Sequence, residues 1–437
     1  IFCYDIKRFQ KFHSDLGFIK KRITESLGDL YGMHWPFKQH KTSRNVKVLP
    51  YHKELKSFGA CFGVSGGYER PMWFALDGEK TEYEYSYNYQ NWYPSAEYET
   101  NNTIRNVGLF DLTPFSKFEI KSDKAHKELQ KICTANIKDQ VGKCTYTNML
   151  NPDGGIETDL TVVCIDINHF WIISSAVSRE RDKFHIKKYL SNDIELKDVT
   201  DDFCVFGIFG PKSRALMKLI SKNDFENDNF KFGTGKYITI EGIKCWAQRL
   251  SYVGELGFEL YVKSNYSRQV YELLMHKGKE FNLSNCGMHA MDIMRMESGF
   301  LHWGHDISPE ENQYQAGLSF AVSIKKKEDF VGKKALEKIK KLKNKKRFGM
   351  FTLKNSKPGE PLLLHDEPIY LEDKIIGRST SGNYSFNFKK NLTFGYINND
   401  FSNEKLKGSK LFIEVEKKKY EIEFINKPLK QTNFKNN

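Results

Sequence analysis

Alternating apolar and polar positions predict a β-hairpin near the middle of the chain. Two runs rich in Thr, Tyr, Ile and Val, residues 145–150 and 156–166, flank the sequence Asn-Pro-Asp-Gly-Gly. In this sequence Pro152 sets a φ suited to a turn, and Gly154 and Gly155 can take the positive φ values that tight reversals need. The pattern therefore places two antiparallel strands on either side of a short turn.

Asp159 is the unusual residue of this hairpin. Successive side chains of a strand point to opposite faces, so Asp159 lies on the face opposite Ile156, Leu160 and Val162. A carboxylate on a strand that is otherwise apolar needs a partner, which can be solvent, a cation or a ligand. An edge strand with a hydrated outer face is the simplest alternative.

A second stretch, residues 249–262, has the same form. It predicts a strand, a glycine-containing turn at residues 253–257, and a second strand that carries Glu259 between Phe258 and Leu260. Two hairpins with a polar centre predict one pocket built from strand residues, although each hairpin alone also fits an ordinary sheet edge.

The remaining pattern predicts both helices and strands. Helices are expected at residues 103–109, 123–133, 178–190, 211–219, 267–279 and 287–298. Further strands are expected at residues 118–121, 169–174 and 203–210. Short strand-like runs then recur towards the end of the chain, at residues 348–353, 361–364, 369–371, 374–376, 392–397, 409–415 and 419–424. These elements predict an α+β protein.

Length and cysteine usage narrow the class of protein. With 437 residues, of which 39% are hydrophobic, the chain exceeds one typical domain and can build two to four cores, a range that follows from domain sizes of roughly 100–200 residues. It contains no apolar run of about 18 residues, so we expect no membrane span. The eight cysteines include no CxxC pair and no metal-ligand spacing. They predict buried thiols in a reducing, cytoplasmic compartment and no metal site.

The net charge of +13 has several explanations. It fits a nucleic-acid partner, an anionic ligand or simply a lysine-rich composition. Much of the excess lies in residues 325–347, where lysines would cover almost every face of a helix. We interpret this segment as a solvated helix and linker, and we expect no nucleic-acid partner.

Both hairpins resemble the tetrahydrofolate-binding domain of the glycine-cleavage T-protein (aminomethyltransferase) family. They resemble the C-terminal half of dimethylglycine and sarcosine dehydrogenases more closely still. That family carries GGxxxDLxV and (R/I)xSYxGELGxE hairpins at this separation, which residues 154–162 and 249–259 match. Residues 67–74 (GYERPMWF) match the signature of the dehydrogenases' central connecting domain, and residues 377–385 match the (G)xxTSGxxS loop of the C-terminal barrel. The resemblance covers essentially the whole chain.

The resemblance implies a multi-domain aminomethyltransferase fold with four parts. These are a remnant of a FAD-dependent oxidoreductase domain (1–43), its central domain (44–99), a folate-binding domain (100–344) and a small C-terminal β-barrel (345–437). The GxGxxG dinucleotide fingerprint is absent, so FAD is expected only in a full-length parent. The chain starts with Ile1 rather than methionine, which suggests a processed or incomplete chain.

The resemblance also assigns roles to individual residues. Asp159 matches the carboxylate that accepts a proton, or stabilises positive charge, when the folate amine takes up a one-carbon unit. Glu259 matches the residue that binds paired donors of the pterin, and Tyr252 matches a residue that lines the pterin slot. Arg295 and Trp303 lie in a segment that matches RxxxRLExxxxxxG, and both are expected to contribute to folate binding.

Two charged positions of the family pattern are replaced by uncharged residues. Met291 replaces the first arginine of RxxxRLExxxxxxG, and Gln315 replaces the glutamate of PxEAGL, so no charged role transfers to either position. Arg295 considered by itself would be an ordinary surface charge on a helix. Within the motif, its planar guanidinium group can pair a glutamate or the carboxylates of the pocket.

Three functions remain open. The first is the folate-binding part of a dimethylglycine or sarcosine dehydrogenase-like flavoenzyme of glycine betaine and choline catabolism. It would pass the one-carbon unit of an N-methyl amine to tetrahydrofolate, giving 5,10-methylenetetrahydrofolate. The second is a standalone aminomethyltransferase of the T-protein type, working with a separate flavin-domain or lipoyl partner. The third is a non-catalytic folate-binding module, at which the two departures hint.

The expected ligands follow from these functions. They are tetrahydrofolate and a methylated amine, and the positive charge fits a polyglutamylated folate tail. The compartment would be the cytoplasm, or the mitochondrial matrix in a eukaryote.

Overall fold

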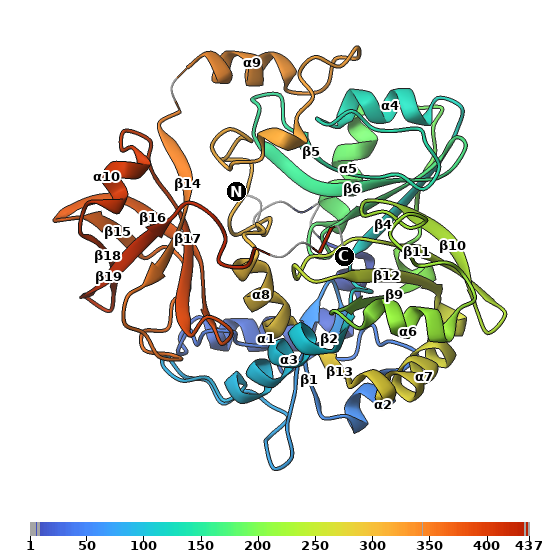
Figure 1. Cartoon of the computed structure of the whole chain (residues 1–437), viewed down its shortest axis with the longest axis horizontal. Coiled ribbons are helices and arrows are strands. Elements are labelled where there is room, and N and C mark those ends of the chain that lie inside the picture. Colours follow the sequence, from blue (N-terminus) through green and yellow to red (C-terminus); the bar gives the residue numbers. More distant parts are fainter. Residues whose placement is uncertain (1–5, 7–8, 343, 432–433, 436–437) are drawn as a thin grey trace.

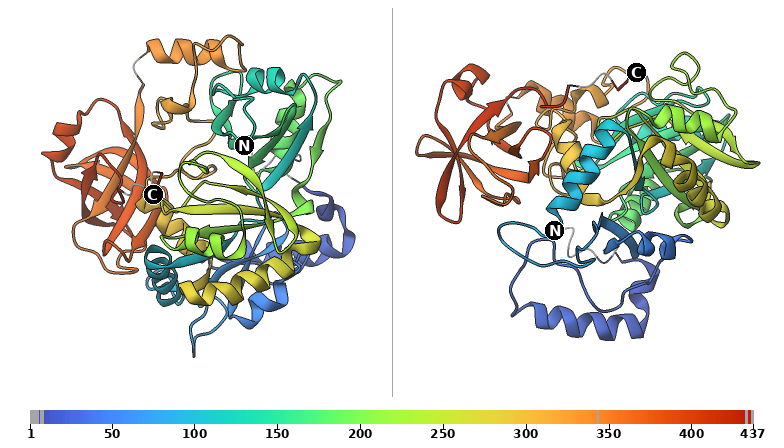
Figure 2. Two further views of the ribbon diagram at one scale, coloured as in Figure 1. Left: turned by 45° about the vertical axis from the view of Figure 1, so that its right-hand side comes forward. Right: turned by 60° about the horizontal axis from the view of Figure 1, so that its bottom comes forward.

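The computed structural model describes residues 6, 9–342, 344–431 and 434–435. Two β-sheets with flanking helices form one side of the molecule, and a closed β-barrel forms the other (Figure 1). Figure 2 shows the N-terminal segment, with α1 (Leu16–Asp29), on a third side below them. No helix in these ranges is long and apolar enough to cross a lipid bilayer. The architecture is therefore the α+β, multi-domain arrangement that the sequence predicts.

Two mostly antiparallel sheets carry both predicted carboxylates. The first sheet has six strands, in the order β10 (Gly235–Ile240), β11 (Ile243–Gln248), β12 (Gly257–Lys263), β9 (Phe203–Phe209), β3 (Val107–Asp111) and β13 (Leu283–Cys286). The second has five strands, in the order β5 (Cys144–Leu150), β6 (Ile156–Asp166), β7 (His169–Ser174), β4 (Ser116–Lys121) and β8 (Leu196–Asp198). The predicted hairpin at residues 145–166 is confirmed as β5 and β6.

Strand alternation gives each sheet one face for helices and one face for the other sheet. Phe258 and Leu260 of β12 share a core with residues of α6 (Ser213–Ile220) and α7 (Ser267–Gly278). Leu160 of β6 shares a core with residues of α4 (Ala125–Ile132) and α5 (Arg179–Tyr189). The opposite faces meet in a core between the sheets, where Val163 of β6 and Tyr261 of β12 both pack.

The C-terminal barrel closes from six strands. Their order is β14 (Lys346–Leu353), β17 (Lys390–Asn398), β16 (Lys374–Ser385), β15 (Pro368–Leu371), β18 (Leu411–Val415) and β19 (Lys418–Ile425). The other elements are the hairpin β1 (Ala60–Ser65) and β2 (Tyr68–Phe74) and the helices α2 (His52–Ser57), α3 (Tyr93–Arg105), α8 (Met288–Glu297), α9 (Lys333–Lys341) and α10 (Asn403–Lys407). Helix α8 packs against β16 and joins the barrel to the rest of the molecule.

The predicted buried thiols are present for seven of the eight cysteines. Cys3 lies outside the described residues. The others are buried and form no disulfide with one another: Cys61, Cys133, Cys144, Cys164, Cys204, Cys245 and Cys286.

Two predicted elements are wrong in their boundaries. The helix predicted at residues 103–109 ends at Arg105, because Asn106 has φ −135° and ψ −113° and β3 then begins at Val107. The strand predicted at residues 249–252 is a loop. Strand β11 ends at Gln248, and the buried Arg249 side chain turns inward to donate to the Phe230 carbonyl oxygen over 2.8 Å.

Two further predictions concern the barrel. Residues 377–385 form part of β16 rather than a loop, because they pair with β17 along their length. Residues 361–364 form no strand and instead cross β16 at Gly382, where an added Cβ would lie 2.4 Å from the Leu363 Cβ. The glycine in this motif therefore allows a close approach of two backbone segments.

Candidate functional site

Asp159 lies in the middle of a sheet, not at its edge. Its strand β6 is paired with β5 on one side and β7 on the other, so the edge-strand explanation does not apply. The Tyr146 hydroxyl donates to Asp159 Oδ2 over 3.3 Å, and Asn148 is the partner of Asp159 across the β5–β6 pair. Burial raises the pKa of Asp159 to about 6, although the Tyr146 hydrogen bond acts in the opposite direction.

Glu259 has a comparable position on the first sheet. Gln248 Nε2 donates to its Oε2 over 2.7 Å, and the Tyr261 hydroxyl donates to the same oxygen over 3.0 Å. Burial raises the pKa of this carboxyl group as well. Within the described part of the chain, Oε1 accepts no hydrogen bond and therefore has its acceptor capacity left for a ligand.

Both carboxylates lie on the inner faces of the two sheets. Asp159 and Val163 lie on the same face of β6, and Glu259 and Tyr261 lie on the same face of β12. Val163 and Tyr261 belong to the core between the sheets. The Cys144 thiol lies 3.9 Å from Gln248 Oε1 and connects the two layers directly. The inner faces of the two polar-centred strands thus meet in one core, and a single pocket shared by the two carboxylates stays a prediction.

Tyr252 and Trp303 lie on the loops around this layer. The Tyr252 hydroxyl donates to the Leu301 carbonyl oxygen over 2.9 Å, and its ring stacks on Phe300 with the ring centroids 6.0 Å apart. The Trp303 indole N–H donates to the carbonyl oxygen of Ile156, at the start of β6, over 3.2 Å. Both aromatic residues therefore tie the segment after α8 to the two hairpins.

Arg295 is buried, with only 2% of its side chain exposed, so it is not a surface helix charge. Its guanidinium donates to Asp292 Oδ1 over 2.8 Å and to Asp306 Oδ2 over 2.6 Å. The remaining contacts are with the Phe300 carbonyl oxygen and Ser381 Oγ, at 3.2 and 2.9 Å. Burial alone would lower the pKa of Arg295, but the two aspartates raise it.

These contacts make Arg295 the centre of a clamp between α8 and the barrel. Its carboxylate partners are Asp292 and Asp306, not the glutamate or the pocket carboxylates that were expected. Every guanidinium nitrogen is used within the protein, so a direct folate contact stays a prediction. Two further bonds run from β16 to α8, from Asn383 Nδ2 to Asp292 Oδ2 and from the Ser385 hydroxyl to Glu297 Oε1, at 2.9 and 2.5 Å.

Three residues beside Asp159 were not predicted. Tyr146 and Asn148 could have been found by counting register, because strand β5 brings both to the neighbourhood of Asp159. Gln313 had no sequence signal. Its Nε2 donates to Asn148 Oδ1 over 3.4 Å, while Asn148 Nδ2 and Gln313 Oε1 are buried without a partner in the described ranges. An unpaired donor and an unpaired acceptor close to the Asp159 carboxylate fit a polar heterocyclic ligand.

Metal-ligand geometry occurs in the described chain at one place, away from β6 and β12. It consists of Glu25 and Asp29 of α1 together with His40. Lys38 Nζ lies 2.6 Å from Asp29 Oδ1, so a lysine already pairs one of the three.

Three sequence families match successive parts of the chain. The GCVT N-terminal domain family matches residues 51–326, and the glycine cleavage T-protein C-terminal barrel domain family matches residues 346–430. The FAD dependent oxidoreductase central domain family matches residues 1–48. The boundaries predicted at residues 43, 99 and 344 stay predictions.

Relatives come from both branches of the predicted resemblance. The 4-methylaminobutanoate oxidase (formaldehyde-forming) of Paenarthrobacter nicotinovorans is 35% identical over 381 residues, which cover 87% of this chain and 46% of that protein. The mitochondrial dimethylglycine dehydrogenase of Rattus norvegicus is 33% identical over 386 residues, which cover 88% and 44%. The aminomethyltransferase of Alkaliphilus metalliredigens is 29% identical over 332 residues, which cover 76% and 88%.

A solved structure shares the fold. The glycine cleavage system aminomethyltransferase T from Bartonella henselae superposes with a TM-score of 0.74 and 22% identity, over 88% of this chain and 98% of that chain. The present chain spans about half the length of the oxidase and dehydrogenase relatives. Because the GCVT N-terminal domain family matches more than half of the chain and the barrel domain family matches the part that follows, the chain belongs to the glycine-cleavage T-protein family and is related to the dimethylglycine and sarcosine dehydrogenases.

Proposed function

We propose that this chain binds tetrahydrofolate between its two sheets and passes to it the one-carbon unit of an oxidised N-methyl amine, giving 5,10-methylenetetrahydrofolate. The observation that carries this proposal is Asp159, a half-buried carboxylate on a central strand whose pKa is raised to about 6. No cation pairs with it within the described ranges. A carboxyl group with a pKa of about 6 can take up and release a proton near neutral pH.

Tetrahydrofolate supplies, when bound, an amine that can take up the one-carbon unit. At about pH 8 Asp159 is ionised, because this pH lies above its pKa of about 6. It can then accept the proton that the amine loses, while the Tyr146 hydroxyl holds the carboxylate in position. A positioned base of this kind typically contributes about 10²–10⁴-fold to a rate.

Glu259 is suited to orient the ligand. Gln248 and Tyr261 fix its Oε2, so Oε1 points to a defined place and can accept from a ring N–H. Asn148 Nδ2 and Gln313 Oε1 offer one donor and one acceptor on the opposite sheet and the adjoining loop. A pterin presents donors and acceptors along its edge, so these groups fit it.

We propose that the amine is oxidised at a flavin on a separate domain, attached to this chain or provided by a partner. The dehydrogenase and oxidase relatives support this function, since this chain corresponds to about half of their length. The aminomethyltransferase relative, matched over 88% of its own length, supports a second candidate, transfer from a carrier-bound aminomethyl group.

The test measures binding and transfer separately. Tetrahydrofolate binding is followed by isothermal titration calorimetry. Transfer is followed as 5,10-methylenetetrahydrofolate formed while a separate flavin oxidase demethylates dimethylglycine or sarcosine. We expect Asp159→Asn to bind folate and lose transfer, while the control Asp166→Asn, at the exposed end of the same strand, keeps both. Full transfer by Asp159→Asn would refute the assigned role.

The other two functions give different results in the same experiment. Transfer from an aminomethyl-lipoyl carrier, with none from the oxidised amine, would replace the proposed donor. Binding of folate without transfer from either donor by the wild-type chain would identify a non-catalytic module.

A further inference from the structure

Arg70 of β2 is a buried arginine that forms no salt bridge in the described part of the chain. Only 7% of the residue is exposed. Its guanidinium makes one hydrogen bond within that part, a long contact of 3.5 Å from Nη2 to the Asp111 carbonyl oxygen. Nε is buried without a partner. Nη1 also has no partner among the described residues, but it still reaches accessible space.

The nearby carboxylates are occupied elsewhere. Glu69 precedes Arg70 in the chain, so it lies on the other face of β2, and it accepts from Arg44 Nε over 2.9 Å. The Asp111 carboxylate accepts from the Tyr51 hydroxyl over 3.2 Å and takes no hydrogen bond from Arg70. The guanidinium therefore has no directly bonded anion in the described ranges.

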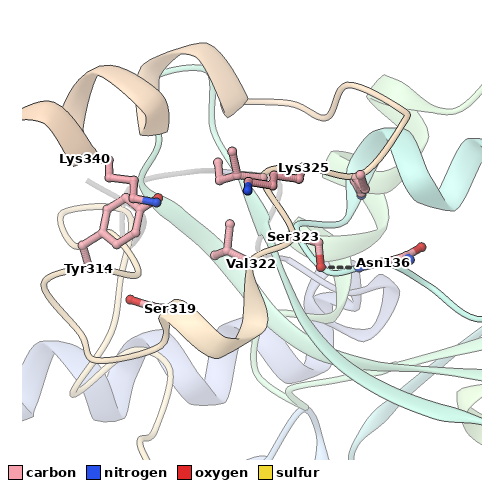
Figure 3. Close-up of a pocket in the computed structure, with 9 residues that line it drawn as sticks. Asn136, Tyr314, Ser319, Val322, Ser323, Lys325 and Lys340 are labelled. Atoms are coloured by element: carbon pink, nitrogen blue, oxygen red, sulfur yellow. Dashed lines mark hydrogen bonds between the residues drawn. The ribbon is translucent and has the colours of Figure 1, made fainter.

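Burial is what makes this charge unusual. Lys325 and Lys340, which line a cavity of about 690 Å³ beneath α9, are exposed, so water stabilises their charges (Figure 3). An arginine shielded from water normally has an anion as its partner. Burial lowers the pKa of Arg70 to about 10, although Asp111 acts in the opposite direction. The guanidinium is therefore still charged at neutral pH.

Arg70 lies at the border of the layer between the two sheets. Its Cζ lies 5.5 Å from the centre of the Phe115 ring. Phe115, on the loop between β3 and β4, packs against the core between the sheets, and Tyr252 packs against the same core. The β1–β2 hairpin thus brings a cation to the edge of the layer that also contains Asp159 and Glu259.

The free end of this guanidinium suits a carboxylate. Nη1 and Nη2 form a planar fork that matches the two oxygens of a carboxylate, and only Nη2 is engaged by a described residue, at 3.5 Å. The N-methyl amines of the proposed reaction, dimethylglycine and sarcosine, each carry a carboxylate one carbon away from the methylated nitrogen. A donor held by its carboxylate keeps the nitrogen and the carbon to be transferred free to reach the folate amine.

We propose that Arg70 binds the carboxylate of the amine that delivers the one-carbon unit, and thereby selects N-methyl amino acids over simple alkyl amines. The inference rests on the proposed function, because it names the class of donor for the same site. Arg70 forms no covalent bond and moves no proton in this role. It holds one end of the donor, so less freedom has to be lost when the carbon is transferred.

The experiment compares N,N-dimethylglycine with N,N-dimethylethanolamine, an amine of similar size in which a hydroxymethyl group replaces the carboxylate. Binding to the whole chain is measured by NMR titration of the methyl signals of each amine. A charge-assisted pair with a buried guanidinium changes affinity by about tenfold or more. We expect the wild-type chain to prefer dimethylglycine by at least this factor, and Arg70→Met to bind both amines about equally.

Two further variants complete the test. Arg70→Lys keeps the charge but loses the planar fork, so it should keep only part of the preference, and it decides the question if Arg70→Met does not fold. The matched control is Arg105→Met, which removes the same charge from an exposed position at the end of α3 and should keep the full preference. Thermal melts show which variants are folded.

The readout is the ratio of the two affinities, because a merely structural role of Arg70 would weaken the binding of both amines alike. An unchanged ratio in the Arg70 variants, or a lost preference in Arg105→Met, would overturn the assignment. Equal binding of both amines by the wild-type chain, or binding of neither, would also overturn it. Failure of the wild-type chain to bind tetrahydrofolate in calorimetry would instead overturn the proposed function.

Discussion

Replacing Asp159 by asparagine should make the protein more stable and less active at once. Burial raises the pKa of Asp159 from 3.8 to about 6 in the folded chain, so ionising it opposes folding. Asparagine removes the charge but keeps a carbonyl oxygen to accept the Tyr146 hydrogen bond. The gain in stability and the loss of transfer therefore come from the same desolvated carboxylate.

The expected gain in the free energy of unfolding follows from the pKa shift of Asp159. A shift of about two pKa units, at about 1.36 kcal/mol each, sets an upper limit of about 3 kcal/mol. Because Asp159 is only half-buried, solvent screens part of this, and we expect about 1–3 kcal/mol at about pH 8. The folded pKa lies above the unfolded one, so the wild-type chain loses stability as pH rises from about 4 to about 6.

The assay is thermal and urea unfolding of wild type and Asp159→Asn at several pH values. The variant should be close to wild type at about pH 4 and should gain its full advantage above about pH 6. Asp166→Asn, on the exposed end of β6, should show no such pH-dependent gain. A variant that is less stable than wild type at about pH 8, or whose advantage does not grow with pH, would refute the reasoning.

Three other substitutions test the remaining parts of the site. Arg295→Met should lower the free energy of unfolding by about 3–5 kcal/mol in urea titrations, because it leaves its buried carboxylate partner without a counter-charge; a loss below about 1 kcal/mol would contradict this. Glu259→Gln should weaken tetrahydrofolate binding about tenfold or more in calorimetry without lowering the melting temperature, and unchanged affinity would remove its assigned role. Gly155→Ala should lower the melting temperature, because the added Cβ would lie 2.0 Å from the Pro309 carbonyl oxygen. Gly28→Ala, with open space around the added Cβ, is the control. Equal melting temperatures of the two variants would show that the chain tolerates a Cβ at position 155.

Local chemistry explains what the sequence could predict. The β5–β6 hairpin follows from alternation and turn residues that are neighbours in the chain, and Gly154 takes the expected positive φ of 87°. Gly155 is needed for a different reason, the close Pro309 carbonyl, which no local pattern reveals. The hairpin was therefore predictable, whereas one of the two reasons for its glycine pair was not.

Long-range contacts explain what the sequence could not predict. Arg295 was assigned to the site by its motif, but its partner Asp306 lies on the loop after α8 and its partner Ser381 comes from the barrel. Residues 377–385 resemble a loop when read alone, because their glycines and hydroxyl groups are common in turns. Pairing with β17 overrides that local tendency.

The clamp between α8 and β16 has a consequence for how such proteins evolve. The barrel and the two-sheet part of the chain match separate families, which suggests modules that could be exchanged. Yet cutting between them would strip Ser381 and Thr380 from Asp306, and Ser385 from Glu297, leaving buried carboxylates short of partners. We therefore expect a foreign barrel to destabilise the protein unless it brings hydroxyl groups at these same positions.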